Sequence, residues 1–173
     1  MKMKGAEIMH KYKYCNNKVD LLWKRKNRIE AVLFMGFMIE FFIKETIGTF
    51  EKIIEGSVLA YKVGFNPSNL YRKDIEKQPL GFLITVLDSY TKDKRIIKKL
   101  RNFSEIRNKC VHGLFGQKLV KLNKELKSFN LFYYKLLFDL MKLDTRLLDV
   151  ANKSFYSICD DCHKKAIKKV VKY

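Results

Sequence analysis

The fold is decided by residues 119–150, which read LVKLNKELKSFNLFYYKLLFDLMKLDTRLLDV. Apolar side chains recur there at alternating steps of three and four residues, which is a heptad pattern. The ten positions of this stripe are Leu119, Leu122, Leu126, Phe129, Tyr133, Leu136, Leu140, Leu143, Leu147 and Val150. A strict period of this kind favours packing against another long helix at a shallow angle. The partner is either residues 27–62 or the same segment in a second copy of the chain.

A second apolar face lies beside the heptad stripe. Its members are Leu131, Phe132, Tyr134, Leu137, Phe138 and Met141. One helix of a small monomer seldom needs two apolar faces, because one face is enough to contact a single core. The pattern therefore predicts a homodimer.

The remaining segments are also predicted to be helical. Residues 27–62 contain no proline, and their apolar side chains recur with the period of one helical face. That face consists of Ile39, Ile43, Ile47, Phe50, Ile54, Val58 and Tyr61. Pro79 suits the first turn of a further helix, and Thr91 and Asp93 suit the cap of the next one. Because no segment shows the two-residue period of a strand, we expect an all-α fold, an antiparallel bundle of four or five helices.

The chain is strongly basic. Its 173 residues include 36 Lys and Arg against 18 Asp and Glu, a formal net charge of +18. Such a charge attracts polyanions and is screened by salt, which excludes an acidic or neutral enzyme surface. A hydrophobic content of 47% with only 2 Pro excludes a disordered tail and a collagen. Nucleic acid or another anionic surface is the first candidate partner.

Length and charge predict one domain with basic ends. We expect residues 1–26 to be a basic N-terminal flank and residues 27–173 to be a single helical bundle with a basic C-terminal end. The most apolar stretch, 31–43, has 13 residues, fewer than the roughly 20 of a membrane span. Four cysteines are too few for a disulfide scaffold, and no cleavable leader is evident. These features predict a cytoplasmic protein without a membrane partner.

Cys159, Cys162 and His163 form the one cluster with metal-ligand spacing. Cys-x-x-Cys-His also occurs in c-type haem attachment, but that attachment requires export. With His10 or Cys15 as a fourth ligand, the cluster could instead hold zinc. A structural zinc site usually has a second Cys or His pair at comparable spacing, which the sequence lacks. We therefore expect no metal and no cofactor.

Residues 107–112, RNKCVH, contain the side chains that RNA cleavage without a metal requires. A group that titrates near neutrality must take the proton of the ribose 2′-OH or deliver one to the leaving 5′-oxygen, and histidine suits this task. His112 is the candidate. The charge that grows on the phosphate needs a fixed cation, and the guanidinium of Arg107 fits phosphate oxygens better than an ammonium does. Asn108 lies one helical turn before His112, so its amide could orient the imidazole.

The same spacing favours a site built from two copies. On one helix Arg107 is turned well away from His112, so the two side chains converge more readily when each comes from a different chain. Cys110, inside the motif, is expected to be a small buried hydrophobe and not a nucleophile.

The stretch 79–115, above all LRNFSEIRNKCVHGLF at 100–115, resembles the HEPN domain family. That family is marked by Arg-x4-6-His at the end of a helix in an antiparallel bundle, and Arg107, Asn108 and His112 match this motif. The resemblance implies a metal-independent endoribonuclease, commonly a toxin or an antiviral defence effector, in which two motifs meet across a homodimer. The implied products are a 2′,3′-cyclic phosphate and a 5′-hydroxyl. A nucleotidyltransferase-like antitoxin is a candidate partner under the same resemblance.

Basic residues crowd the helix that carries the motif. The expected RNA contacts are Lys94, Arg95, Lys98, Lys99, Arg101 and Lys109. Contacts of this kind neutralise phosphates without reading the sequence, so binding should weaken as salt rises.

The sequence leaves alternatives open for the motif. Arg107 could pair with Glu105 or with the helix end, where His112 could also act as a cap. Glu40 and Glu45 are carboxylates on an apolar helix, where a buried carboxylate usually has a partner, and either could contact Arg107. A separate alternative for the whole chain is a non-catalytic helical module that binds nucleic acid or a protein through the basic surface or the heptad stripe.

Overall fold

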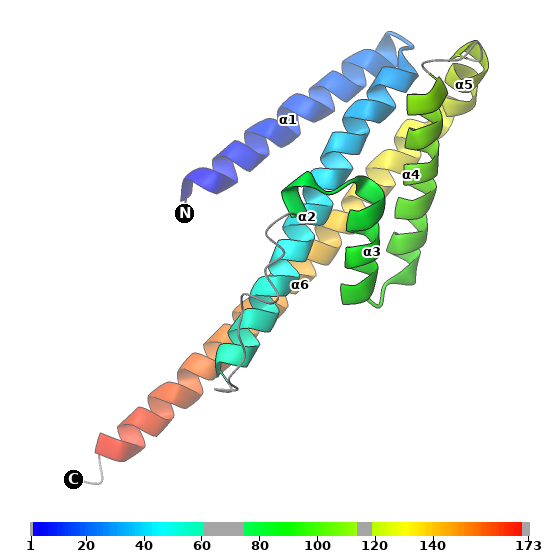
Figure 1. Cartoon of the computed structure of the whole chain (residues 1–173). Helices are drawn as coiled ribbons and strands as arrows, with labels where there is room; N and C mark the ends of the chain where they lie inside the picture. Colours follow the sequence, from blue (N-terminus) through cyan, green and yellow to red (C-terminus); the bar gives the residue numbers. More distant parts are fainter. Residues whose placement is uncertain (1, 61–74, 114–118, 171–173) are drawn as a thin grey trace.

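The computed structural model describes residues 2–60, 75–113 and 119–170, with side chains for residues 10, 12–54, 75, 77–112 and 120–150. The helices are α1 (Lys2–Lys24), α2 (Arg28–Ala60), α3 (Leu80–Tyr90), α4 (Lys94–Gly113), α5 (Leu119–Glu125) and α6 (Phe129–Val170), with short 3-10 turns η2 (Ile75–Lys77) and η3 (Leu126–Ser128) (Figure 1). No strand occurs in these ranges. The predicted all-α bundle is therefore confirmed.

Helix α2 is the centre of the bundle. It contacts α1, α3, α4 and α6. Helix α6 runs beside α2 in the same direction, while α1 and α2, and α3 and α4, form antiparallel pairs (Figure 1). Of the two partners that the sequence left open for residues 119–150, residues 27–62 are in contact with them, chiefly through α6.

The core lies where α2, α3, α4 and α6 meet. Ile39, Ile43 and Ile47 of the predicted α2 face are completely buried. They pack with Leu83, Leu87, Leu100, Phe103, Tyr133, Leu136 and Leu140 from the other three helices. Phe50 and Ile54 of that face are half-buried, and Val58 and Tyr61 lie outside the described side chains. The heptad stripe is buried from Leu126 to Leu143, but Val150 is 52% exposed, so the predicted inward face is correct only within the bundle and not at its end.

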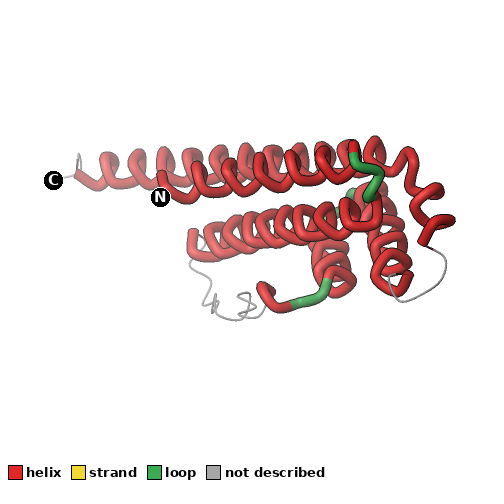
Figure 2. Tube along the Cα trace, turned by 90° about the horizontal axis from the view of Figure 1, so that it is seen from above, coloured by secondary structure: helices red, strands yellow, loops and turns green. Residues whose placement is uncertain are grey.

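The heptad segment is not one continuous helix. Residues 119–125 form α5, the turn η3 follows, and only then does α6 begin, so α5 points away from the axis of α6 (Figure 2). A tertiary contact accompanies this change of direction: Asn123 of α5 binds the turn between α1 and α2. Its Nδ2 donates to the Lys26 carbonyl at 2.9 Å, and its Oδ1 accepts from the Arg28 amide at 3.2 Å. The spacing of apolar residues cannot show this bond.

The turn between α1 and α2 places Lys26 in a left-handed conformation. Its φ is 60°. The Asn27 amide donates to the Leu22 carbonyl at 2.9 Å, and the Lys26 amide donates to the Trp23 carbonyl at 3.0 Å. These two bonds form a Schellman motif, in which glycine is the usual residue at the left-handed position.

We expect Lys26→Gly to raise the free energy of unfolding by about 0.5–1 kcal/mol, because glycine removes the steric cost of positive φ. Urea denaturation measures the change. Lys24→Gly, inside the last turn of α1, is the matched control and should lower the same free energy by about 0.5–1 kcal/mol. A loss of stability in Lys26→Gly would contradict the assigned turn.

The basic N-terminal flank is helical and shares the bundle's core. The predicted boundary between residues 26 and 27 coincides with the α1–α2 turn. Val19 and Leu22 of α1 are nonetheless buried. Tyr133 donates a hydrogen bond to Asn16 at 3.2 Å, and Tyr134 donates one to Asp20 at 2.6 Å. Burial and then the nearby Asp20 raise the pKa of Tyr134.

The second apolar face of residues 131–141 is partly covered within one chain. Leu137 is buried, and Phe132 and Tyr134 pack against the core from half-buried positions. Leu131 and Phe138 remain 63% and 56% exposed. Three of the six side chains behind the dimer prediction therefore have their contacts inside the bundle.

Candidate functional site

Helix α4 carries the motif, and its start is fixed by Asp93. The Asp93 carboxylate accepts hydrogen bonds from the Arg95 and Ile96 amides at 3.2 and 3.3 Å, and the Asp93 amide donates to the Thr91 hydroxyl at 3.1 Å. These are the cap contacts predicted for Thr91 and Asp93. From this cap the apolar face of α4 enters the core at Leu100 and Phe103, both completely buried. Residues 107–112 consequently lie in the last turns of a rigidly packed helix.

Arg107 points from α4 toward α2. Its Nη2 forms an ion pair with the Glu40 carboxylate at 3.2 Å, and the two side chains are only 25% and 19% exposed. A Cβ added at Gly36, one turn before Glu40, would lie 3.0 Å from Arg107 Nε. The arginine side chain therefore crosses α2 where the absence of a side chain leaves room for it.

This geometry decides between the partners that the sequence left open for Arg107. Glu40 is the partner, whereas Glu45 and Glu105 are exposed. Arg107 Nε is buried and has no hydrogen-bond partner among the described residues. A guanidinium carries five N–H donors. Glu40 therefore leaves part of this hydrogen-bonding capacity unused, and the ion pair holds the group in one place.

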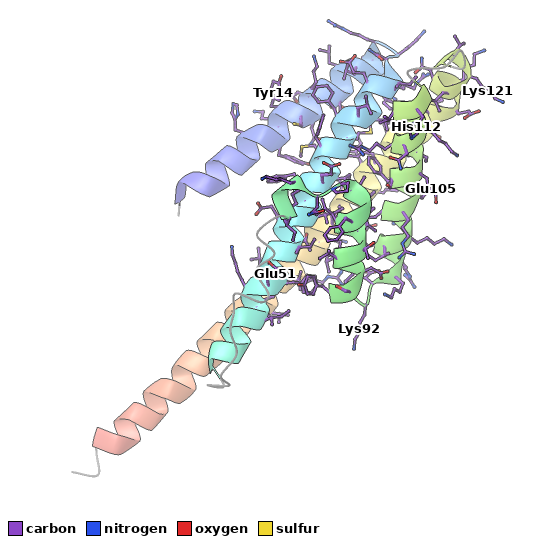
Figure 3. All side chains as sticks on the ribbon, in the orientation of Figure 1. Tyr14, Glu51, Lys92, Glu105, His112 and Lys121 are labelled. Carbon is purple, nitrogen blue, oxygen red and sulfur yellow. The ribbon has the colours of Figure 1, made fainter. Side chains whose placement is uncertain are left out.

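Asn108, Lys109 and His112 are exposed on α4. His112 lies near the end of α4 that approaches α5 (Figure 3). With 100° per residue, Asn108 and His112 are about 40° apart around the helix, whereas Arg107 and His112 are about 140° apart. One chain thus places Asn108 and His112 on the same face and turns Arg107 toward α2.

Cys110 is completely buried in the core. Burial raises the pKa of its thiol to about 11. Since the thiolate is the nucleophilic form of cysteine, Cys110 is a packing residue, as predicted.

We expect Cys110 to react with iodoacetamide at pH 8 at least about tenfold more slowly in the folded protein than in urea, because its pKa is raised and the core shields the thiol. Mass spectrometry of the peptide that contains Cys110 measures both rates. Equal rates in the two states would show that the thiol is accessible.

The six basic residues predicted to bind RNA all lie on α4. Arg101 pairs with Asp88 of α3 at 2.7 Å, and Lys94 pairs with the same carboxylate. The hydrogen bond from Lys94, helped by the charge of Arg101, lowers the pKa of Asp88. Lys99 pairs with Asp139 of α6. Arg95, Lys98 and Lys109 form no ion pair among the residues that the structure describes.

The tertiary structure adds residues from α6 that the sequence did not indicate. Lys142 and Arg146, one helical turn apart, line an open depression together with Arg95 and Lys99 of α4. Phe138, one turn before Lys142, lines it as well. The only hint in the sequence is the four-residue spacing of these three side chains, which does not indicate that α4 lies beside them.

The predictions of no metal site and no membrane span can be compared with the structure only for the described residues. No cluster of three or more His, Cys, Asp or Glu side chains occurs among the described residues, but the side chains of Cys159, Cys162 and His163 lie outside them. Within the same limits, no helix has the length and apolar character needed to cross a membrane.

Comparison with known proteins gives no relative for this chain: no family model, no curated protein and no solved structure matches it. The resemblance of residues 79–115 to the HEPN domain family therefore remains a prediction from the motif.

Proposed function

We propose that this protein is a metal-independent endoribonuclease of the HEPN type. One observation carries the proposal: Arg107 is held by Glu40 over Gly36, while His112 and Asn108 are exposed further along the same basic helix. A fixed guanidinium and an accessible imidazole are the two groups that phosphodiester cleavage needs when no metal takes part.

The reaction follows from these groups. The ribose 2′-oxygen attacks the adjacent phosphorus while its proton passes to a base, and the bond to the 5′-oxygen breaks as that oxygen receives a proton. His112 serves as base or acid, and Asn108 orients its imidazole. Arg107 stabilises the charge on the non-bridging oxygens. The products are a 2′,3′-cyclic phosphate and a 5′-hydroxyl.

The active form in this proposal is a homodimer. Because about 140° of helix rotation separates Arg107 from His112, a single α4 does not direct both groups to one phosphate. In the dimer, His112 of one copy must therefore approach the exposed edge of Arg107 of the other copy, which lies between α4 and α2 and is 25% exposed. An RNA-cleaving activity of this kind suits a cytoplasmic toxin or defence effector that a nucleotidyltransferase-like antitoxin restrains.

The test is incubation of the purified protein with labelled RNA in excess chelator, followed by analysis of the ends. We expect cleavage to continue, with 5′-hydroxyl ends that polynucleotide kinase labels directly and 3′ ends closed as cyclic phosphates. Cleavage that stops on chelation, or 5′-phosphate products, would overturn the proposal.

A second candidate is a non-catalytic helical module that binds nucleic acid through α4. The observation in its favour is the Arg107–Glu40 ion pair, because a neutralised guanidinium attracts a phosphate less strongly than a free one. This candidate predicts binding that weakens with salt and no cleavage in any buffer. Absence of cleavage together with retained RNA binding would favour it.

A further inference from the structure

The first half of α4 and the middle of α6 form the walls of an open depression of about 680 Å³. Arg95 and Lys99 contribute from α4, and Phe138, Lys142 and Arg146 contribute from α6. A second depression of about 740 Å³ lies on α4 and shares Arg95 and Lys99 with the first. We call the first of these the α4–α6 groove. The shared residues make the two depressions one continuous surface.

More basic than acidic residues line this surface. The basic residues that line the two depressions are Lys94, Arg95, Lys98, Lys99, Arg101, Lys142 and Arg146, and the acidic ones are Asp88, Asp93, Glu105 and Asp139. Lys99 pairs with Asp139, and Arg146 lies 3.9 Å from Asp93. Arg95 and Lys142 form no ion pair within the described residues. The remaining positive charge is complementary to a chain of phosphates.

Phe138 gives the groove a feature that a purely electrostatic surface lacks. Phe138 is 56% exposed, although it belongs to a helix whose opposite face is buried in the core. The ammonium of Lys142 lies 4.5 Å from the centroid of the Phe138 ring. An exposed aromatic ring that shares a groove with cations is the arrangement on which single-stranded nucleic acids stack their bases while their phosphates contact Lys and Arg. A base that stacks on Phe138 either displaces Lys142 from the ring or uses the other face. Bases that are already paired in a duplex do not offer a free face to such a ring.

We propose that the α4–α6 groove binds single-stranded RNA, with a base stacked on Phe138 and the neighbouring phosphates on Arg95, Lys142 and Arg146. The choice of RNA as the ligand rests on the proposed function. Along α4, the 17 residues from Arg95 to His112 span about 25 Å. That distance corresponds to about seven nucleotides of stacked strand at about 3.4 Å each. In this proposal the groove binds one part of the RNA strand, and the strand continues along α4 to His112.

Binding is measured by fluorescence anisotropy of a labelled, unstructured RNA of about 15 nucleotides. The His112→Ala background prevents cleavage during the measurement. Phe138→Ala should weaken binding between about 5-fold and 150-fold, the effect of removing one stacked base. Lys142→Gln with Arg146→Gln should reduce the slope of log affinity against log salt by about 1.4, which is the loss of two phosphate contacts on a single strand.

Two control variants are matched to these changes. Leu131→Ala removes another exposed apolar side chain of α6 that does not line the groove. Lys13→Gln with Lys52→Gln removes two exposed charges from α1 and α2, neither of which lines either depression or belongs to α4. Both controls should keep the affinity within about twofold, because surface changes away from a contact have small effects. Thermal unfolding of each variant verifies that the helices are intact.

Unchanged affinity in Phe138→Ala would overturn the proposal, and so would equally tight binding of a duplex of the same length. Conversion of an oligomer to a monomer in Phe138→Ala, with RNA affinity unchanged, would assign the ring to a contact between copies instead. Loss of binding in Phe138→Ala while the wild type cuts no RNA supports the groove and refutes the nuclease. Cleavage by the wild type with no effect of Phe138→Ala on binding supports the nuclease and refutes the groove.

Discussion

Replacing His112 by alanine is expected to lower the rate of RNA cleavage by about 10²- to 10⁴-fold, the contribution of a positioned acid or base. The side chain is exposed at the end of α4 and lies outside the core, so its removal should leave the fold intact. The rate is measured with labelled RNA in chelator, at protein concentrations high enough to saturate the substrate. A parallel binding measurement should show little change in affinity, because the imidazole acts on the transition state and not on the bound RNA.

His10→Ala is the matched control for this variant. His10 is an exposed histidine on α1, so its substitution makes the same chemical change away from α4. Full activity is expected. Equal losses in the two variants would point to a general effect of histidine removal, and full activity in His112→Ala would remove His112 from the mechanism.

Replacing Phe103 by alanine is expected to lower the free energy of unfolding by about 3–5 kcal/mol, the cost of a large cavity in a packed core. Phe103 is completely buried, and its ring stacks on Phe129 at the start of α6 with centroids 5.7 Å apart. This contact joins α4 to α6. The change is measured as a shift of the urea midpoint at constant m-value.

Phe138→Ala provides the comparison for Phe103→Ala, because the same atoms are removed from a ring that is 56% exposed. Its free energy of unfolding should change by no more than about 0.5 kcal/mol. Similar losses in the two variants would mean that the packing of α4 against α6 differs from the structure described above. The small effect expected for Phe138→Ala is also what makes this variant a valid probe of RNA binding.

Local patterns account for much of the architecture. The all-helical class, the buried face at Ile39, Ile43 and Ile47 and the cap at Asp93 follow from periodicity and from capping chemistry, which act over a few residues. Residues 26 and 27 lie in the α1–α2 turn, but Val19 of α1 belongs to the same core as the rest of the bundle. In the motif at 107–112, helical spacing alone predicts that the side chain of Arg107 points in a different direction from that of His112.

The contacts that shape the candidate site have a different origin. Glu40 and Glu45 are equivalent partners for Arg107 in the sequence, and the crossing of Arg107 over Gly36 brings only Glu40 within 3.2 Å. At the break between α5 and α6, Asn123 contacts the α1–α2 turn, which lies 95 to 97 residues away in the chain. Leu137 and Phe138 are adjacent apolar residues, yet Leu137 is buried in the core and Phe138 lines the groove.

Residue types and their spacing were therefore enough to determine the all-helical class, the central buried faces and which side chains could perform the chemistry, because these properties arise from interactions within one or two helical turns. Only the packing of the helices decided which carboxylate holds Arg107 and that Lys142 and Arg146 join the basic surface of α4. Those outcomes depend on the relative position of distant helices, which is fixed by the way their side chains fit together in the core.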